Sequence, residues 1–178
     1  LGFLSLGYYY GGIIADKGAS LQKLAQILWL AGICTFFIAT FKEPVLQLFA
    51  TITSGDIKTG SLLSIIVLFG PVSVLLGFVA PMVIKLKLNN LGSIGKDIGN
   101  VYALSTMGSI IGTFLSGYYL IPFFGNTNLI YIVSIVLLIL SLFVNTKIDS
   151  KRIITILILS VLYYLRVYQG LFNLASIA

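Results

Sequence analysis

Long apolar runs without a charged side chain dominate the pattern of hydrophobic and polar positions in this chain. The longest run extends over residues 98–146, and two shorter ones cover 59–84 and 24–41. About 20 apolar residues in a helix cross the roughly 30 Å hydrocarbon core of a bilayer. Because backbone polar groups in lipid must be satisfied within their own segment, these runs predict membrane-spanning helices and not open strands.

The segmentation of these runs predicts an all-α fold, a polytopic bundle of about six transmembrane helices. We expect them at 1–15, 21–41, 61–85, 98–121, 127–145 and 153–170. Ser20, Thr127 and Ser150 precede apolar runs and are suitable helix caps. The chain opens inside an apolar segment, so we expect a truncated first helix and a single integral membrane domain, 1–178, belonging to a longer protein.

The region after the second expected helix is too short to span the bilayer. Lys42, Glu43 and Pro44 follow one another there, and the proline predicts that the helix ends. Residues 45, 46, 48, 49 and 52 are apolar and fall on one helical face. We expect an interfacial helix over 44–53 on the outer membrane surface, with a re-entrant loop as the alternative.

Composition agrees with a membrane domain and limits the chemistry. The chain is 58% hydrophobic and 9% charged, with no histidine, one cysteine and five acidic residues, whereas a soluble domain carries about 25% charged residues. These residues supply neither a metal cluster nor a Ser-His or Cys-His nucleophile pair. We therefore expect no catalytic, cofactor-binding or metal-binding residues in this chain.

The distribution of basic residues predicts the topology. Eight lysine and arginine side chains fall in or beside the loops at 16–23, 85–97 and 146–152, and two fall between the second and third helices. By the positive-inside rule those three loops face the cytoplasm of a multi-pass plasma-membrane protein. The net charge of +6 does not indicate nucleic-acid binding, because the basic residues lie at helix ends and form no continuous face. The side of the C-terminal tail stays open.

Two glycine- and proline-containing segments are candidate structural or gating elements. Gly7 and Gly11 form a small-xxx-small face that lets a neighbouring helix approach closely. Pro71 and Pro81 lie inside the third apolar segment, where each proline frees a carbonyl and kinks the helix. Such a kink serves either as a hinge or as a fixed shape.

A third segment, 98–121, combines small and polar residues. Gly108, Gly112 and Ser116 recur every four residues, and Tyr102 adds a hydroxyl in the same helix. We expect this helix to be the most tightly packed member of the bundle, with helix packing as the simplest role for these residues.

The segment that ends in Ala15-Asp16-Lys17-Gly18 resembles the cytoplasmic loop signature of major facilitator transporters. The resemblance implies that Asp16 accepts a helix N-terminus or a basic partner and locks the bundle on the inward side. The alternative is that Asp16 and Lys17 are an acid and a base solvated at a membrane edge.

Residues 1 to about 142 together resemble the membrane half of the fused, transporter-like spermidine synthase family. The resemblance rests on the Gly-Gly-x-x-Ala-Asp loop ending at Asp16, the Pro-x4-Leu-Gly-x3-Pro helix from Pro71, and the Gly-x3-Gly-x2-Tyr-Ala-Leu helix through Tyr102. Ser105 stands where the family pattern has asparagine. The resemblance implies a major-facilitator-like fold and an aminopropyltransferase domain elsewhere in the full-length chain.

Two functions follow as hypotheses. In the first, the chain anchors or scaffolds a synthase-like domain, with the bilayer and other transmembrane helices as partners. In the second, it is a small-molecule transporter or part of one. The sequence contains no G-x-G-x-x-G turn and no hydrophilic α/β pattern after residue 146, so residues 1–178 alone should not catalyse aminopropyl transfer.

Overall fold

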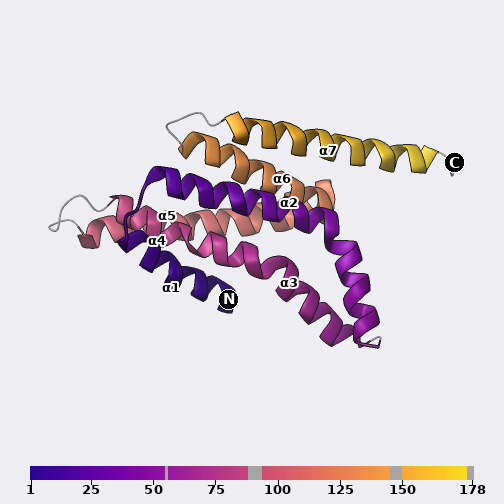
Figure 1. Cartoon of the computed structure of the whole chain (residues 1–178), viewed down its shortest axis with the longest axis horizontal. Coiled ribbons are helices and arrows are strands. Elements are labelled where there is room, and N and C mark those ends of the chain that lie inside the picture. Colours follow the sequence, from indigo (N-terminus) through magenta and orange to yellow (C-terminus); the bar gives the residue numbers. More distant parts are fainter. Residues whose placement is uncertain (55, 88–93, 145–149, 176–178) are drawn as a thin grey trace. The chain divides into compact units, whose positions relative to one another are not determined.

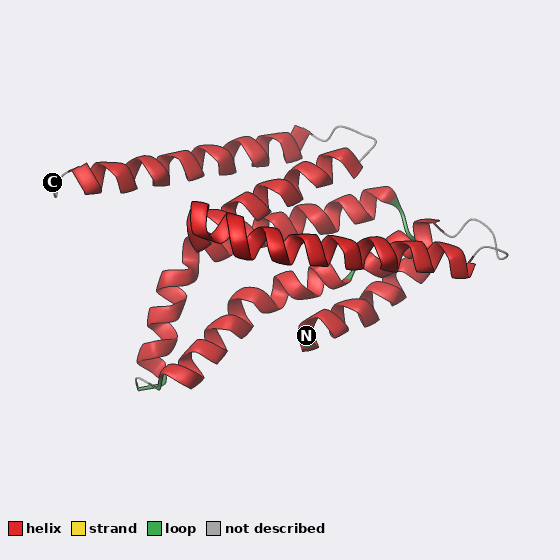
Figure 2. Cartoon of the chain, turned by 180° about the vertical axis from the view of Figure 1, so that it is seen from behind, coloured by secondary structure: helices red, strands yellow, loops and turns green. Residues whose placement is uncertain are grey.

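The computed structural model describes residues 1–54, 56–87, 94–144 and 150–175, and every element in these ranges is helical (Figure 1; Figure 2). The elements are α1 (Gly2–Asp16), α2 (Leu21–Ile52), α3 (Ile57–Gly77), α4 (Val79–Lys87), α5 (Ile94–Leu115), the π-helical turn η2 (Ser116–Leu120), α6 (Ile121–Val144) and α7 (Ser150–Ala175). The chain forms two compact units, 1–146 and 147–178, and α7 belongs to the second. The all-α prediction is confirmed for the described residues.

The described residues form five continuous helical stretches and not the six expected. The helices predicted at 98–121 and 127–145 are joined without an intervening loop, because α5, η2 and α6 follow one another directly from Ile94 to Val144. The stretch is broken only at Gly125, where φ is 73° and ψ is 162°. Glycine reaches this positive φ without a Cβ clash, so a single residue replaces the expected loop.

The prediction that Lys42-Glu43-Pro44 ends the second helix is wrong. Helix α2 continues through Pro44 to Ile52, a length of 32 residues. A proline removes one backbone hydrogen bond and bends the helix without having to end it. Figure 1 shows α2 changing direction in its second half, so the interfacial helix expected at 44–53 is instead the last part of α2.

Three of the described helical stretches are long and apolar enough to cross a membrane. They are Leu21–Ile52, Ile57–Lys87 and Ile94–Val144. The second contains α3 and α4, which are separated at Phe78. This count, made from length and composition, supports a membrane protein in contact with the lipid bilayer.

Contacts between individual residues show the relative directions of the helices in the first unit, 1–146. Positions along α1 meet successively later positions of α3 and α4, from Gly7 beside Gly77 to Asp16 beside Lys85, so these elements are parallel. Along α2 and α6 the order is reversed, because Gly32 meets Leu138 whereas Lys42 meets Thr127. Helices α2 and α6 are therefore antiparallel.

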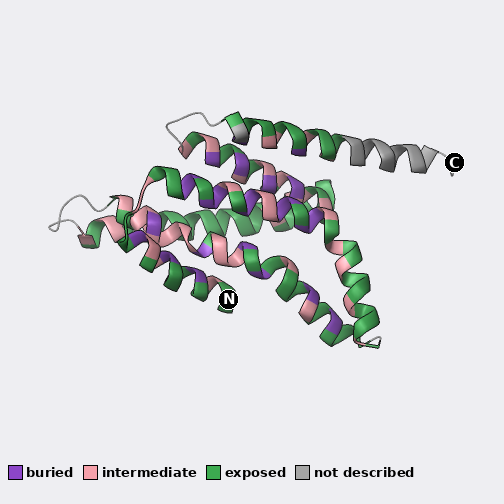
Figure 3. Cartoon of the chain, viewed as in Figure 1, coloured by how far each residue is buried: buried purple, intermediate pink, exposed green. Residues whose placement is uncertain are grey.

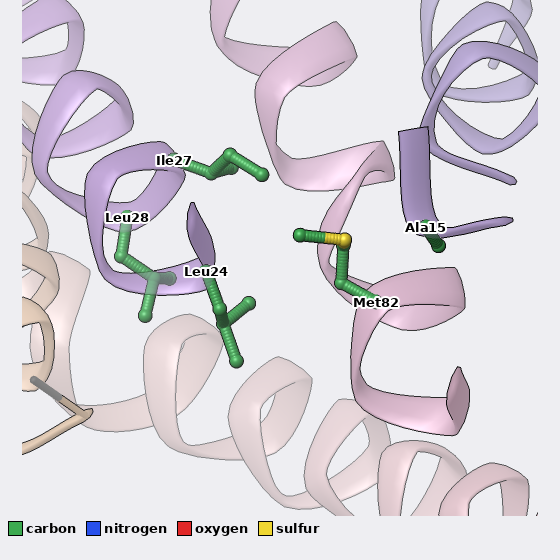
Figure 4. Packing of buried hydrophobic residues seen from close by; sticks show 5 residues of the cluster. All are labelled: Ala15, Leu24, Ile27, Leu28 and Met82. Carbon is green, nitrogen blue, oxygen red and sulfur yellow. The ribbon is translucent and has the colours of Figure 1, made fainter. Parts of the chain in front are cut away.

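One edge of this unit consequently collects the ends of α1, α4 and α6 with the start of α2. A buried cluster lies at this edge and contains Ala15, Leu24, Ile27, Leu28 and Met82 (Figure 4). Leu137 and Val144 of α6 pack against it. Figure 3 shows that buried positions concentrate on α2 and its neighbours, whereas α5 is mostly exposed.

Candidate functional site

Helix α1 approaches the end of α3 through glycines. A Cβ added at Gly7 would lie 2.4 Å from the carbonyl oxygen of Val74 and 2.8 Å from the Cα of Gly77. A Cβ added at Gly77 would lie 2.7 Å from the carbonyl oxygen of Leu4. Backbone therefore touches backbone, and the close approach expected at Gly7 is confirmed.

The second glycine of this face lies against the predicted proline segment. A Cβ at Gly11 would lie 2.7 Å from the Cα of Phe78 and 3.0 Å from the Cγ of Pro81. Pro81 is in α4 next to the break at Phe78, whereas Pro71 is exposed inside α3. Of the two prolines, Pro81 is the one that the structure brings against α1.

Asp16 has a basic partner at the end of this interface. The Nζ of Lys85 donates to Oδ1 of Asp16 at 2.8 Å and so connects the ends of α1 and α4. The Lys85 and Asp16 side chains are 47% and 74% exposed, respectively, and exposed pairs of this kind typically contribute about 0–1 kcal/mol. Lys17 caps α1 through its backbone and its side chain is exposed. The motif marked Asp16, but nothing in the sequence identified a partner 69 residues away.

A groove of about 380 Å³ lies between α1, the end of α3, α4 and α5. Tyr102 of α5 lines it, together with Tyr8, Leu76, Val79, Ala80, Val83, Ile84, Val101, Leu104 and Ser105. Tyr8 and Tyr102 are 48% and 61% exposed. The lining is apolar apart from three hydroxyl groups, and no charged side chain belongs to it. Such a surface favours apolar or neutral molecules over ions.

The expectation that 98–121 is the most tightly packed helix is wrong for this chain. No residue of α5 is buried, and a Cβ added at Gly108 or Gly112 would meet nothing within 4 Å. The spacing of these residues correctly indicates a helix face made of small side chains. It could not show that no helix in the described part of this chain covers that face.

The sequence did not predict the polar contacts between α2 and α6. The hydroxyl of buried Ser134 donates to the carbonyl oxygen of Gly32 at 2.8 Å. At the other end of this pair, Lys42 donates to the hydroxyl of Thr127. A serine inside an apolar run is a weak sequence signal, because its hydroxyl can instead donate to a carbonyl of its own helix, as Ser64 does to Gly60.

The described residues contain no group of three or more histidine, cysteine, aspartate or glutamate side chains placed to hold a metal ion. In comparisons with known proteins, no family model, curated protein or solved structure matches the chain. The resemblance to transporter-like spermidine synthases therefore remains a prediction that rests on the three motifs.

Proposed function

We propose that this chain is an integral membrane scaffold that holds apolar helices together and anchors a partner domain. One observation carries the proposal: the described buried residues of the first unit, 1–146, pack helix against helix and include no carboxylate. Among the described residues, the acids Asp16, Glu43, Asp56 and Asp97 lie at helix ends or beyond the apolar part of α2. A synthase-like domain in the same full-length chain is the partner that the motif resemblance favours.

The position of the acids argues against transport of polyamines. A multivalent cation in a low-dielectric site needs carboxylates facing it, and proton coupling needs a titratable group within the membrane. No carboxylate and no histidine is among the residues that line the groove at Tyr8 and Tyr102. Its apolar lining favours a second candidate function, transport of a neutral or apolar solute in the manner of a major facilitator protein.

We further propose a multi-pass plasma-membrane topology with residues 16–23, 85–97 and 146–152 facing the cytoplasm. The helix directions place the ends of α1, α4 and α6 at one edge, where Lys17, Lys23 and Lys85 also lie. Parts of the last two loops are outside the described residues. The basic excess at this edge supports its cytoplasmic location.

Site-directed labelling tests the topology. In a Cys34→Ala background, single cysteines replace Lys96 in the first turn of α5 or Lys58 in the first turn of α3, both of which are exposed. An impermeant maleimide added to intact cells should label the Lys58→Cys protein only. Labelling of both variants from outside would refute the topology.

Reconstitution tests the scaffold against the transporter. The purified chain in vesicles should show no saturable uptake of labelled spermidine or putrescine, with or without a pH gradient, and no aminopropyl transfer. Saturable uptake that Asp16→Asn abolishes and Asp97→Asn preserves would overturn the scaffold proposal. Uptake restricted to neutral solutes and blocked by Ser105→Phe would favour the second candidate.

A further inference from the structure

We propose that α1 holds α3 and α4 at a fixed angle, so that the break between them at Phe78 is a rigid bend and not a hinge. The proposal goes beyond the scaffold function and does not depend on it. It rests on the contacts that one uninterrupted helix makes with both sides of the break.

A proline accounts for the break. Pro81 has no backbone N–H to donate to the carbonyl of Gly77, four residues earlier, and its ring would clash with that carbonyl in a continuous helix. Helix α3 accordingly ends at Gly77, and α4 begins at Val79. Phe78 donates its backbone N–H to the carbonyl oxygen of Leu75 at 3.2 Å. Residues at the ends of such elements can absorb a change of angle unless another element restrains them.

Helix α1 touches α3 immediately before the break. A Cβ added at Gly7 would lie 2.8 Å from the Cα of Gly77, and a Cβ added at Gly77 would lie 2.8 Å from the Cα of Gly7. These atoms belong to backbone, so the contact does not depend on side-chain rotamers. The position of α1 against this end of α3 is therefore fixed by the two main chains.

The next turns of α1 touch the break itself and then α4. A Cβ added at Gly11 would lie 2.7 Å from the Cα of Phe78 and 3.0 Å from the Cγ of Pro81. Ala15 belongs to the buried cluster that contains Met82 of α4. Asp16 then pairs with Lys85, so contacts continue to the last turn of α1.

These contacts oppose a change of angle because they lie along one helix. Helix α1 has 15 residues and is about 20 Å long. If α4 rotated about Phe78 while α3 kept its contact at Gly7, α4 would move into or away from Gly11 and Asp16. Glycine has no side chain that could follow such a movement, so the close contact would be lost or overlap.

A fixed bend also keeps the width of the groove constant. Leu76 lines the groove before the break, Val79 and Ala80 line it after the break, and Tyr8 of α1 completes this part of the wall. Because residues from both sides of the break form the groove, any change of angle would widen or narrow it. We therefore expect the groove to be present in the absence of a bound molecule.

Distances between pairs of spin labels test the proposal in detergent micelles by double electron–electron resonance. In a Cys34→Ala background, exposed Val67 of α3 and exposed Lys87 of α4 are replaced by labelled cysteines, so the pair spans the break. A reference pair at Lys58 and Leu76 lies within α3. The pair across the break should give a distance distribution as narrow as that of the reference pair.

Two adjacent glycines of α1 provide a matched comparison. Gly11→Ala adds a methyl group where the backbone of Phe78 leaves no space, whereas a Cβ at Gly12 meets nothing within 4 Å. Gly11→Ala should broaden or shift the distribution across the break, and Gly12→Ala should leave it unchanged. Neither should alter the reference pair. Gly7→Ala separates α1 from the α3 side and should also broaden the distribution, which keeps the test decisive if Gly11→Ala does not fold.

Three outcomes would overturn the proposal. One is a distribution across the break that is already broader than the reference in the unmodified background. The second is an unchanged distribution in folded Gly11→Ala and Gly7→Ala proteins, which would assign the angle to α3, α4 and α2 without α1. The third is an equal effect of Gly11→Ala and Gly12→Ala.

Discussion

Replacing Gly7 by alanine should destabilise the bundle, although alanine is the better helix former. The added Cβ would lie 2.4 Å from the carbonyl oxygen of Val74 and 2.8 Å from the Cα of Gly77. Both atoms belong to backbone, so no side-chain rotation relieves the overlap, and α1 must move away from α3. Overpacking of this kind costs about 3 kcal/mol at the upper end of its usual range.

The helix propensity of alanine partly offsets this cost. Alanine is about 1 kcal/mol better than glycine inside a helix, which leaves a net loss of about 2 kcal/mol for Gly7→Ala. Gly112→Ala is the matched control, because a Cβ at that position meets nothing within 4 Å. The control should be neutral or more stable by up to about 1 kcal/mol.

Equilibrium unfolding of both variants in mixed micelles of a mild detergent and dodecyl sulfate measures the difference. The two variants should differ by about 2–3 kcal/mol in the free energy of unfolding, with Gly7→Ala the less stable. Equal stability, or a larger loss for Gly112→Ala, would refute the close backbone contact between α1 and α3. A larger loss for Gly112→Ala would place such a contact on α5 instead.

Three further predictions concern packing and charge. Leu138→Ala should lower the free energy of unfolding by about 2–5 kcal/mol because it empties a buried site, whereas Leu140→Ala at a 44% exposed site should cost far less in the same assay. Reversing the Asp16–Lys85 pair in a double variant should restore the melting temperature lost on charge reversal at either residue, although the loss itself is small. Hydrogen bonds from the Thr59 hydroxyl and the Lys58 backbone hold the pKa of Asp56 below its usual value. The stabilisation from the ionised Asp56 carboxylate is therefore present above the unfolded-state pKa near 3.9 and is lost as pH falls through the lowered folded-state pKa. Between pH 5 and pH 2, the melting temperature of Asp56→Asn should drop less than that of the unmodified protein.

The membrane character of the fold was predictable because it depends on composition over long windows. An uncharged run such as 98–146 has one medium that tolerates it, and in that medium the backbone must be helical. The number of helical stretches was harder to predict from the sequence. It depended on Gly125 replacing a whole loop and on α2 continuing through Pro44, and each of these is a local choice that tertiary packing makes.

Partners of individual residues were not predictable from the pattern. Gly7 and Gly112 belong to similar small-residue faces, yet one touches the backbone of α3 and the other meets no atom within 4 Å. Spacing along one helix defines a face, but the element opposite that face is set by the register of distant segments. The same limit concealed Lys85 as the partner of Asp16 and Ser134 as the donor to Gly32.

The contrast between these two faces bears on how the bundle is held together. Lipid tails are as apolar as leucine, so helices in a bilayer gain little from hydrophobicity alone and depend on close packing and interhelical hydrogen bonds. Helices α1 and α3 pack closely at Gly7 and Gly77. Helices α2 and α6 are joined by the interhelical hydrogen bond from Ser134. Helix α5 has no buried residue and borders the apolar groove on the side of α4. The small-residue face of α5 at Gly108 and Gly112 therefore makes no close helix contact among the described residues, and α5 depends on its other contacts, which lie beside α4.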